Sequence, residues 1–196
     1  MIAGYHVIFG AYGFWLPNDP RGSWSDFVGS LELLRYGPAT KTTEKKSLAH
    51  REHDRAFRLR AKSALKYPPV RFNGFQARAV ARGLARYFER VSIPVWSCAV
   101  MLDHVHLVIG TPAFSIEQLV IQLKGSATEQ LLRENIHPMA RYASPDGRIP
   151  KCWVRGQWKV FLAPTDVTRA IQYVKDNPVK AGFRKQEWSF VVPYEE

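Results

Sequence analysis

Two histidines two positions apart are the first residues of this chain whose types and spacing suggest chemistry. His104 and His106 lie in a β-branched, apolar run that predicts a strand over 104–110. Because side chains alternate across a strand, both imidazoles project from one face, with Cα atoms about 6.5–7 Å apart. Such a pair can bind one divalent cation with a third ligand from elsewhere, or it can simply make ordinary hydrogen bonds. Val108 occupies the next alternate position, which excludes a histidine-triad nucleotide-binding protein.

A phenol and an amide one helical turn apart form a second candidate group. A helix is predicted over 165–176, closed by Asn177-Pro178. Its apolar stripe consists of Val167, Ala170, Ile171 and Val174. Tyr173 lies about 110° from the centre of that stripe, and Asn177 lies on nearly the same side one turn later. Each has a structural alternative: Tyr173 as an amphipathic residue at the edge of the core, and Asn177 as a helix C-cap.

The chain is strongly basic, and the charge is unevenly placed. It has 28 Lys and Arg against 17 Asp and Glu, a net charge of +11 and a pI near 9.9, which favours a polyanionic partner such as nucleic acid. Ten basic and three acidic residues fall within 41–71, which gives this segment +7. A helix is predicted over 48–65. The segment is interpreted either as an arm that binds phosphates or as a solvated, charged helix.

Length and composition bound the class of protein. The 196 residues predict one domain over 1–196, with a basic insertion at about 41–71. A content of 46% apolar residues excludes a disordered basic tail. We find no apolar run of about 18 residues and no basic N-terminal region, so neither membrane spanning nor secretion is expected. Cys98 and Cys152 are too few for a disulfide framework, and a reducing cytoplasm is the expected location.

The order of the predicted elements indicates an α+β fold. Strands are expected at 5–12, 93–101, 104–110 and 156–162, and helices at 76–91, 115–134 and 165–176. Ser115 and Gln118 predict a capping box for the second of these helices. The order β-α-β-β-α-β is that of the ferredoxin-like split βαβ arrangement, an antiparallel sheet with helices on one face, here followed by a C-terminal helix. Segments 13–25 and 136–151 are expected to be loops.

Two runs of residues carry a resemblance to a known family. The first is Met-Leu-Asp-His-Val-His-Leu-Val-Ile at 101–109, and the second is Tyr-Val-Lys-Asp-Asn-Pro-Val-Lys-Ala-Gly-Phe at 173–183. Together they resemble the HUH single-tyrosine (Y1) transposases of the IS200/IS605 superfamily, and most closely the REP-associated tyrosine transposases. Segments 122–126 and 153–162 also resemble the family. The resemblance extends from 95 to 183 and, more loosely, over 5–24; Leu102 stands where the family usually has proline.

The resemblance implies a metal-dependent DNA transposase, a single-stranded DNA endonuclease and strand transferase. It implies that His104, His106 and Asn177 bind Mg²⁺ or Mn²⁺ and that Tyr173 is the nucleophile, which forms a 5′-phosphotyrosine and frees a 3′-OH. A phenol with a pKa near 10 is mostly protonated at neutral pH, so it needs assistance from a bound cation to attack a phosphodiester. The expected substrate is single-stranded DNA with a hairpin, in mobile-element or REP-like sequences. The tyrosine helix is expected to serve either its own site or that of a second copy in a homodimer.

Contacts to DNA are expected from the aromatic loop and the basic segment. The residues predicted to make them are Trp15, Arg21, Lys45, Lys46, Arg51, Arg55, Arg58 and Lys62. One alternative function is a HUH replication initiator or relaxase-type nicking enzyme, which the long spacing from the histidines to a tyrosine followed by Asn-Pro disfavours. Another is a non-catalytic DNA-binding protein with structural histidines. A zinc hydrolase is disfavoured, because the sequence has no nearby carboxylate or third histidine to complete a typical zinc site.

Overall fold

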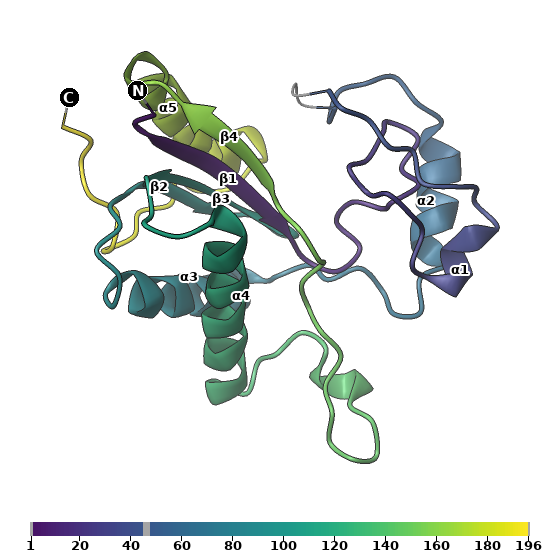
Figure 1. Ribbon diagram of the computed structural model, residues 1–196. Helices are drawn as coiled ribbons and strands as arrows, with labels where there is room; N and C mark the ends of the chain where they lie inside the picture. The colour runs from purple at the N-terminus through teal and green to yellow at the C-terminus, as the bar shows by residue number, and fades with distance from the viewer. Residues whose placement is uncertain (1, 45–47, 196) are drawn as a thin grey trace.

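A four-stranded antiparallel sheet in the order β2-β3-β1-β4 forms the centre of the computed structural model, which describes residues 2–44 and 48–195 (Figure 1). The strands are β1 (Gly4–Gly10), β2 (Val95–Val100), β3 (His104–Gly110) and β4 (Trp158–Leu162). Strand β3 lies between β1 and β2 and is antiparallel to both, while β4 pairs with the other edge of β1. This is the split βαβ arrangement, so the predicted fold class is confirmed. That residues 1–196 form one domain stays a prediction.

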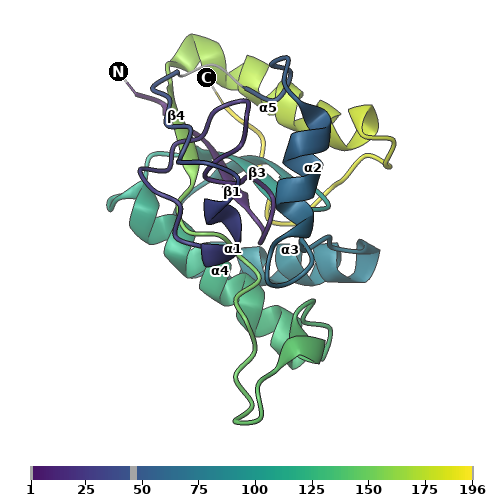
Figure 2. The same ribbon diagram turned by 90° about the vertical axis from the view of Figure 1, so that its right-hand side faces the viewer.

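The described residues form five α-helices, of which three cover the two faces of the sheet. They are α1 (Leu31–Leu34), α2 (Arg55–Ser63), α3 (Gly74–Phe88), α4 (Ile116–Arg133) and α5 (Pro164–Lys180), and a 3-10 turn, Ala140–Tyr142, interrupts the loop before β4. Figure 2 shows α5 above the sheet and α3 and α4 below it. The alternation of the strands explains this division, because one set of side chains packs on α3 and α4 and the other on α5.

The face of the sheet that α3 and α4 cover holds the larger hydrophobic core. Val7 and Phe9 of β1 and Leu107 of β3 are buried there against both helices. The two helices approach closely at Gly83, where an added Cβ would lie 2.6 Å from the Cα of Ala127. A glycine at this position therefore sets the separation of the helix pair, and a larger residue would push the helices apart.

Capping residues place the helix starts. The capping box of Ser115 and Gln118 is present, as predicted. Asn73 and Gln76 form a second box that starts α3 two residues earlier than expected. The prediction of a helix over 48–65 is wrong at its start, because the side chain of Asp54 accepts from the backbone N–H of Phe57 and begins α2 at Arg55.

The end of α5 also differs from the prediction. The helix continues through Pro178 to Lys180, because a proline in the last turn removes only one backbone donor and its own side chain is buried. Gly182, at φ +80°, then ends the helix in a Schellman motif, with Phe183 N–H donating to Pro178 O at 2.8 Å and Gly182 N–H to Val179 O at 2.9 Å. Asn177 is consequently inside the helix and is not its C-cap.

A separate lobe lies beside the end of the sheet, visible at the right of Figure 1. We call residues 14–66, with 45–47 outside the described residues, the inserted lobe. It contains α1 and α2 and has a small core of its own, formed by Leu16, Leu33 and Ala61. The basic segment is thus packed together with the aromatic loop that precedes it. Within the described parts of the chain, no helix is long and apolar enough to span a bilayer.

Candidate active site

The two strand β3 histidines meet at the end of the sheet nearest the inserted lobe. The Nε2 atoms of His104 and His106 are 2.9 Å apart. The two side chains project from the α5 face, opposite the main core, as the alternation of the strand predicts. Two nitrogen ligands at right angles around a cation, each about 2.1 Å from it, would be about 3.0 Å apart. The observed separation therefore matches that of a chelating pair.

Each imidazole also has a partner on its other nitrogen. His104 Nδ1 donates to Asp103 Oδ1 at 2.7 Å, and His106 Nδ1 lies 3.1 Å from Nε2 of His6 on β1. A carboxylate or a neutral hydrogen-bond acceptor behind the ring is the usual support of a metal-binding histidine, since it fixes the orientation and the tautomer. His6 was missed by sequence reasoning. Its position on the same face as His106 follows from its alternation with Val7, but the pairing of β1 with β3 could not be read from the sequence.

Burial keeps two of the three imidazoles neutral near pH 7. Burial lowers the pKa of His6 to about 4. Burial also lowers the pKa of His106 well below its usual value, and the neighbouring His104 and His6 lower it further by disfavouring a second positive charge. A metal ligand must present an unprotonated nitrogen, so this environment prepares His106 for coordination at neutral pH.

Tyr173 stands beside the histidines at the edge of the α5 face that packs on the sheet. Its side chain is 44% exposed, and its ring centroid lies 5.9 Å from that of His106 and 5.7 Å from that of His6, edge-on to both. It lines an open groove of about 300 Å³ between β4 and α5, which Asp166 also lines. The Asp166 carboxylate accepts from Arg169 at 2.6 Å. The phenol is therefore accessible to a large substrate while it remains next to the imidazole pair.

Asn177 lies one turn beyond Tyr173 on the same helix, and its side-chain amide has unused hydrogen-bonding capacity. Its Nδ2 is buried and has no hydrogen-bond partner in the described part of the chain. A 180° rotation of the amide exchanges its oxygen and nitrogen, so the same place can present an oxygen ligand. Among residues 2–44 and 48–195, no group of three or more His, Cys, Asp or Glu is arranged to hold a metal ion. Coordination of a metal by Asn177 together with His104 and His106 stays a prediction.

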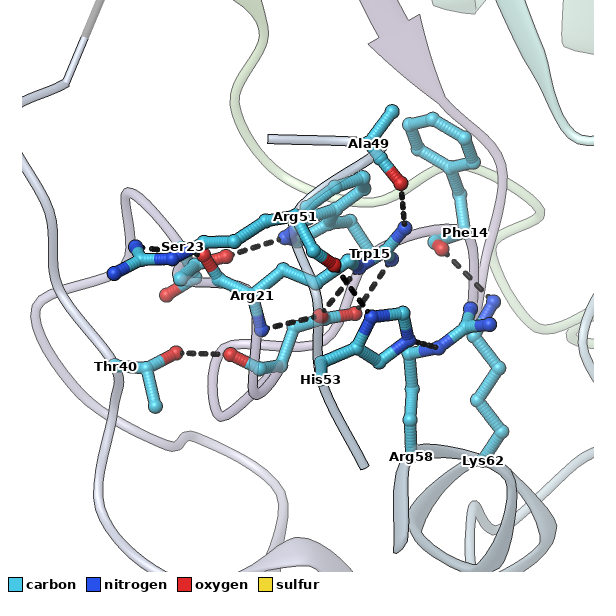
Figure 3. Close-up of polar contacts among 12 residues, drawn as sticks. Phe14, Trp15, Arg21, Ser23, Thr40, Ala49, Arg51, His53, Arg58 and Lys62 are labelled. Carbon is cyan, nitrogen blue, oxygen red and sulfur yellow. Dashed lines mark hydrogen bonds and ion pairs between the residues drawn. The ribbon is translucent and has the colours of Figure 1, made fainter. Parts of the chain in front are cut away.

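Most of the residues predicted to contact DNA lie in the inserted lobe, and several of them are already bonded within it (Figure 3). Arg21 is buried and forms a bidentate ion pair with Asp19, with both nitrogen–oxygen distances at 2.8 Å. The Arg21 guanidinium also stacks on Trp15, 3.7 Å from the ring centroid, and the Trp15 indole donates to Gly22 O at 2.8 Å. Trp15 and Arg21 thus hold the loop together.

The other basic residues predicted to contact DNA differ in how exposed they are. Arg51 and Arg55 are exposed, whereas Arg58 is half-buried and donates to His53 Nε2 at 3.0 Å. Lys62 is half-buried, and its Nζ donates to the backbone oxygen of Phe14 at 2.9 Å. Lys45 and Lys46 lie outside the described residues. DNA contact by these residues stays a prediction. Arg51, although exposed, donates to the backbone oxygen of Arg21 at 3.3 Å, so Arg55 has the freest side chain of those placed.

Tryptophan side chains extend the site toward solvent. Trp158, the first residue of β4, packs edge-on against His6 with centroids 5.3 Å apart. Trp24 is 44% exposed, and its ring lies 6.3 Å from that of Trp158. Aromatic rings of this kind are stacking surfaces for the bases of single-stranded nucleic acid. Neither residue was singled out from the sequence, because nothing in their local pattern places them beside the histidines.

No family model matches this sequence, and no curated protein matches it. Solved structures do match. One is a REP-associated tyrosine transposase bound to a REP hairpin, with 11% identity over 97% of this chain and 76% of that chain and a TM-score of 0.49. Another, from Deinococcus radiodurans R1 and assigned as a transposase, has 15% identity over 90% of this chain and 91% of that chain and a TM-score of 0.39. The first of these carries the name of the family that the two sequence motifs resemble.

Proposed function

We propose that this protein is a metal-dependent single-stranded DNA endonuclease and strand transferase that acts through a tyrosine–DNA intermediate. The observation that carries the proposal is the meeting of the His104 and His106 imidazoles, 2.9 Å apart, with the exposed phenol of Tyr173. Neutral nitrogen ligands next to an accessible nucleophile, in a strongly basic protein, suit attack on a phosphodiester.

His104, His106 and the amide of Asn177 would hold Mg²⁺ or Mn²⁺. When bound, such a cation polarises a non-bridging phosphate oxygen and stabilises the charge that develops on it. The chain's own contribution is to orient these ligands. Asp103 holds the His104 ring through Nδ1, and His6 faces Nδ1 of His106.

The reaction exchanges one phosphate ester for another. The Tyr173 Oη–phosphorus bond forms as the bond from phosphorus to the 3′ oxygen breaks; the phenol loses its proton and the departing 3′ oxygen gains one. Because a phosphodiester is retained, another 3′-OH can reverse the step and join strands without a nucleotide cofactor. The open groove beside Tyr173 gives a DNA strand access to the phenol.

The substrate we propose is hairpin-bearing single-stranded DNA of mobile-element or REP-like sequence. Support comes from the exposed Arg51 and Arg55 of the inserted lobe and from the Trp24 and Trp158 surface beside the histidines. A homodimer in which α5 serves the partner's site is the alternative to a self-contained site. The two cysteines are free and buried, which agrees with the reducing cytoplasm expected for such an enzyme.

Covalent capture tests the proposal directly. A labelled single-stranded hairpin oligonucleotide, taken from the genomic neighbourhood of the coding sequence, is incubated with the protein and Mn²⁺ and then denatured. We expect a protein–DNA adduct that Tyr173→Phe reduces at least 10³-fold, because the nucleophilic oxygen is absent. Tyr36→Phe, in the inserted lobe, is the matched control and should form the adduct normally. An undiminished adduct with Tyr173→Phe would disprove the mechanism. Cutting confined to a replication origin would instead indicate an initiator or relaxase.

A non-catalytic DNA-binding protein is the second candidate, and one observation favours it. The three imidazoles can form one chain of hydrogen bonds in their neutral forms, without a cation. In it, His6 Nε2 donates to His106 Nδ1, His106 Nε2 donates to His104 Nε2, and His104 Nδ1 donates to Asp103. This candidate predicts no Mn²⁺ binding, no adduct and full DNA affinity in the presence of a chelator. A Mn²⁺ titration of the protein and of His104→Ala separates the two functions, since only the enzyme loses a measurable affinity on substitution.

A further inference from the structure

The segments that lead into and out of the inserted lobe are both attached to the turn that precedes strand β3. Where the chain leaves β1, Ala11 N–H donates to Asp103 O at 2.7 Å. Where the chain returns toward α3, Phe72 N–H donates to Leu102 O at 2.5 Å. Leu102 and Asp103 are the two residues immediately before His104. The two connections to the lobe therefore hold the backbone next to a candidate metal ligand.

A phenylalanine of the lobe packs directly on the ligand ring. Phe14 stacks on His104 with ring centroids 4.4 Å apart and an interplanar angle of 26°. The space for it comes from Gly10, which lies opposite His104 in the β1–β3 register; an added Cβ at Gly10 would lie 2.4 Å from Phe14 Cδ1. One face of the His104 imidazole is thus covered by an aromatic ring, and its Nδ1 is bonded to Asp103.

Lys62 of α2 holds Phe14 in place. Its ammonium donates to the Phe14 carbonyl at 2.9 Å, as Figure 3 shows. Burial lowers the pKa of Lys62, and the Asp103 carboxylate raises it in the opposite direction, which shows that the ammonium also feels the charge beside His104. The positive charges of Arg58 and Arg21 lower this pKa, and the carboxylate of Asp19 raises it.

We infer that Lys62 and Phe14 are positioning residues for His104, and that the inserted lobe braces the candidate metal site. The chain of contacts runs from Lys62 to the Phe14 backbone, from the Phe14 ring to His104, and from His104 to the partner imidazole of His106. The inference rests on the proposed function, which makes His104 a ligand, and it replaces the phosphate contact expected of Lys62 from the sequence. Supports of this kind typically contribute 10–100-fold to metal affinity.

The first test follows the His104 ring in the protein without added metal, by NMR of its carbon-bound protons. Phe14→Leu removes the ring current on these protons and should move their signals to lower field. Lys62→Met, which keeps the aliphatic stem, should move them in the same direction by loosening Phe14, and Lys62→Arg should restore the original position. Lys66→Met, an exposed lysine just beyond α2, is the control and should leave them unchanged.

The second test measures Mn²⁺ affinity and DNA binding separately. We expect Phe14→Leu and Lys62→Met to weaken Mn²⁺ binding at least tenfold, with Lys62→Arg restoring it, while hairpin affinity in chelator and its salt dependence stay as in the parent. A phosphate contact predicts the reverse: unchanged Mn²⁺ affinity and ring signals, and a salt slope smaller by about 0.7. That result would overturn the inference.

The two readouts keep failure of the inference distinct from failure of the proposed function. If the parent protein binds no Mn²⁺ and forms no adduct, the proposed function is wrong, yet the His104 signals still report whether Lys62 and Phe14 position the ring. Unchanged signals in both variants would overturn the positioning role whatever the activity. Phe14→Leu leaves every charge in place, so its Mn²⁺ affinity tests the role even if Lys62→Met fails to fold.

Discussion

The candidate active site and the inserted lobe use polar residues in opposite ways. At the site, three imidazoles on two paired strands are mutually bonded, His6 and His106 are buried, and the phenol beside them is left open to solvent. In the lobe, loops carry many cations, yet the buried ones are bonded to the lobe itself, as the Arg21–Asp19 pair shows. The polar groups of the site are few and are oriented by one another. In the lobe, by contrast, some of the cations form bonds that stabilise the lobe itself.

The difference teaches that net charge and available charge are separate quantities. The sequence assigns +7 to residues 41–71, but Lys62 is committed to the Phe14 carbonyl and Arg58 to His53. Small loop-rich lobes have little apolar surface to bury, and this one has a core of only a few side chains. Buried ion pairs and side chain-to-backbone bonds then fix its loops, at the expense of cations that would otherwise bind phosphate.

The largest expected effect comes from the buried ion pair of the lobe. Asp19→Asn leaves the Arg21 guanidinium buried without a counter-charge, and breaking a buried pair in this way costs about 3–5 kcal/mol. We expect hydrogen exchange to accelerate in α1 and α2 while α3, α4 and the sheet keep their protection, since the lobe has its own core. Glu44→Gln, which removes an exposed partner 4.0 Å from Arg51, is the control and should change little. Uniform loss of protection would show that lobe and sheet unfold together.

The next effect in size is the response of the histidine site to acid. The folded-state pKa of His6 is about 4 against 6.5 for the free side chain, so between these values the unfolded chain binds more protons and stability rises with pH. The contribution is complete above pH 6.5, is lost as pH falls toward 4, and amounts to about 3 kcal/mol. Denaturant unfolding in chelator at pH 5 and 7 should show a smaller pH difference for His6→Gln than for the parent.

Direct observation of His6 supplies the check on that result. In the parent protein, the carbon-bound ring protons of His6 should show no titration between pH 7 and 5. A midpoint near 6.5 would contradict the burial effect, and equal pH differences for parent and variant would do the same. Either outcome would remove the contrast between a desolvated site and a charged lobe.

Local patterns in the sequence were enough for the regular elements of the site. Alternation placed His104 and His106 on one strand face, and the helical period placed Asn177 one turn from Tyr173. The predicted end of α5 was wrong. A proline after Asn177 is typical of a helix end, but the helix continues and is ended by the Schellman motif at Gly182. His6 and Phe14 could not be assigned from sequence, since their roles arise from register and from the missing side chain of Gly10.

The smallest expected effect separates free from committed cations within the lobe. Arg51 and Arg55 are exposed, so if the lobe binds a single strand, replacing both with glutamine should reduce the slope of log affinity against log salt by about 1.4, or 0.7 for each phosphate contact. The control is the Arg78→Gln, Arg90→Gln pair, which removes one exposed arginine of α3 and one exposed arginine just beyond its end, both outside the inserted lobe. Equal slopes in the lobe variant and the parent would reassign Arg51 and Arg55 to a solvated surface.

Because Lys62 is bonded to the Phe14 carbonyl, adding Lys62→Met to the Arg51→Gln, Arg55→Gln variant should not change its slope further. A further decrease would show that its charge also reaches DNA.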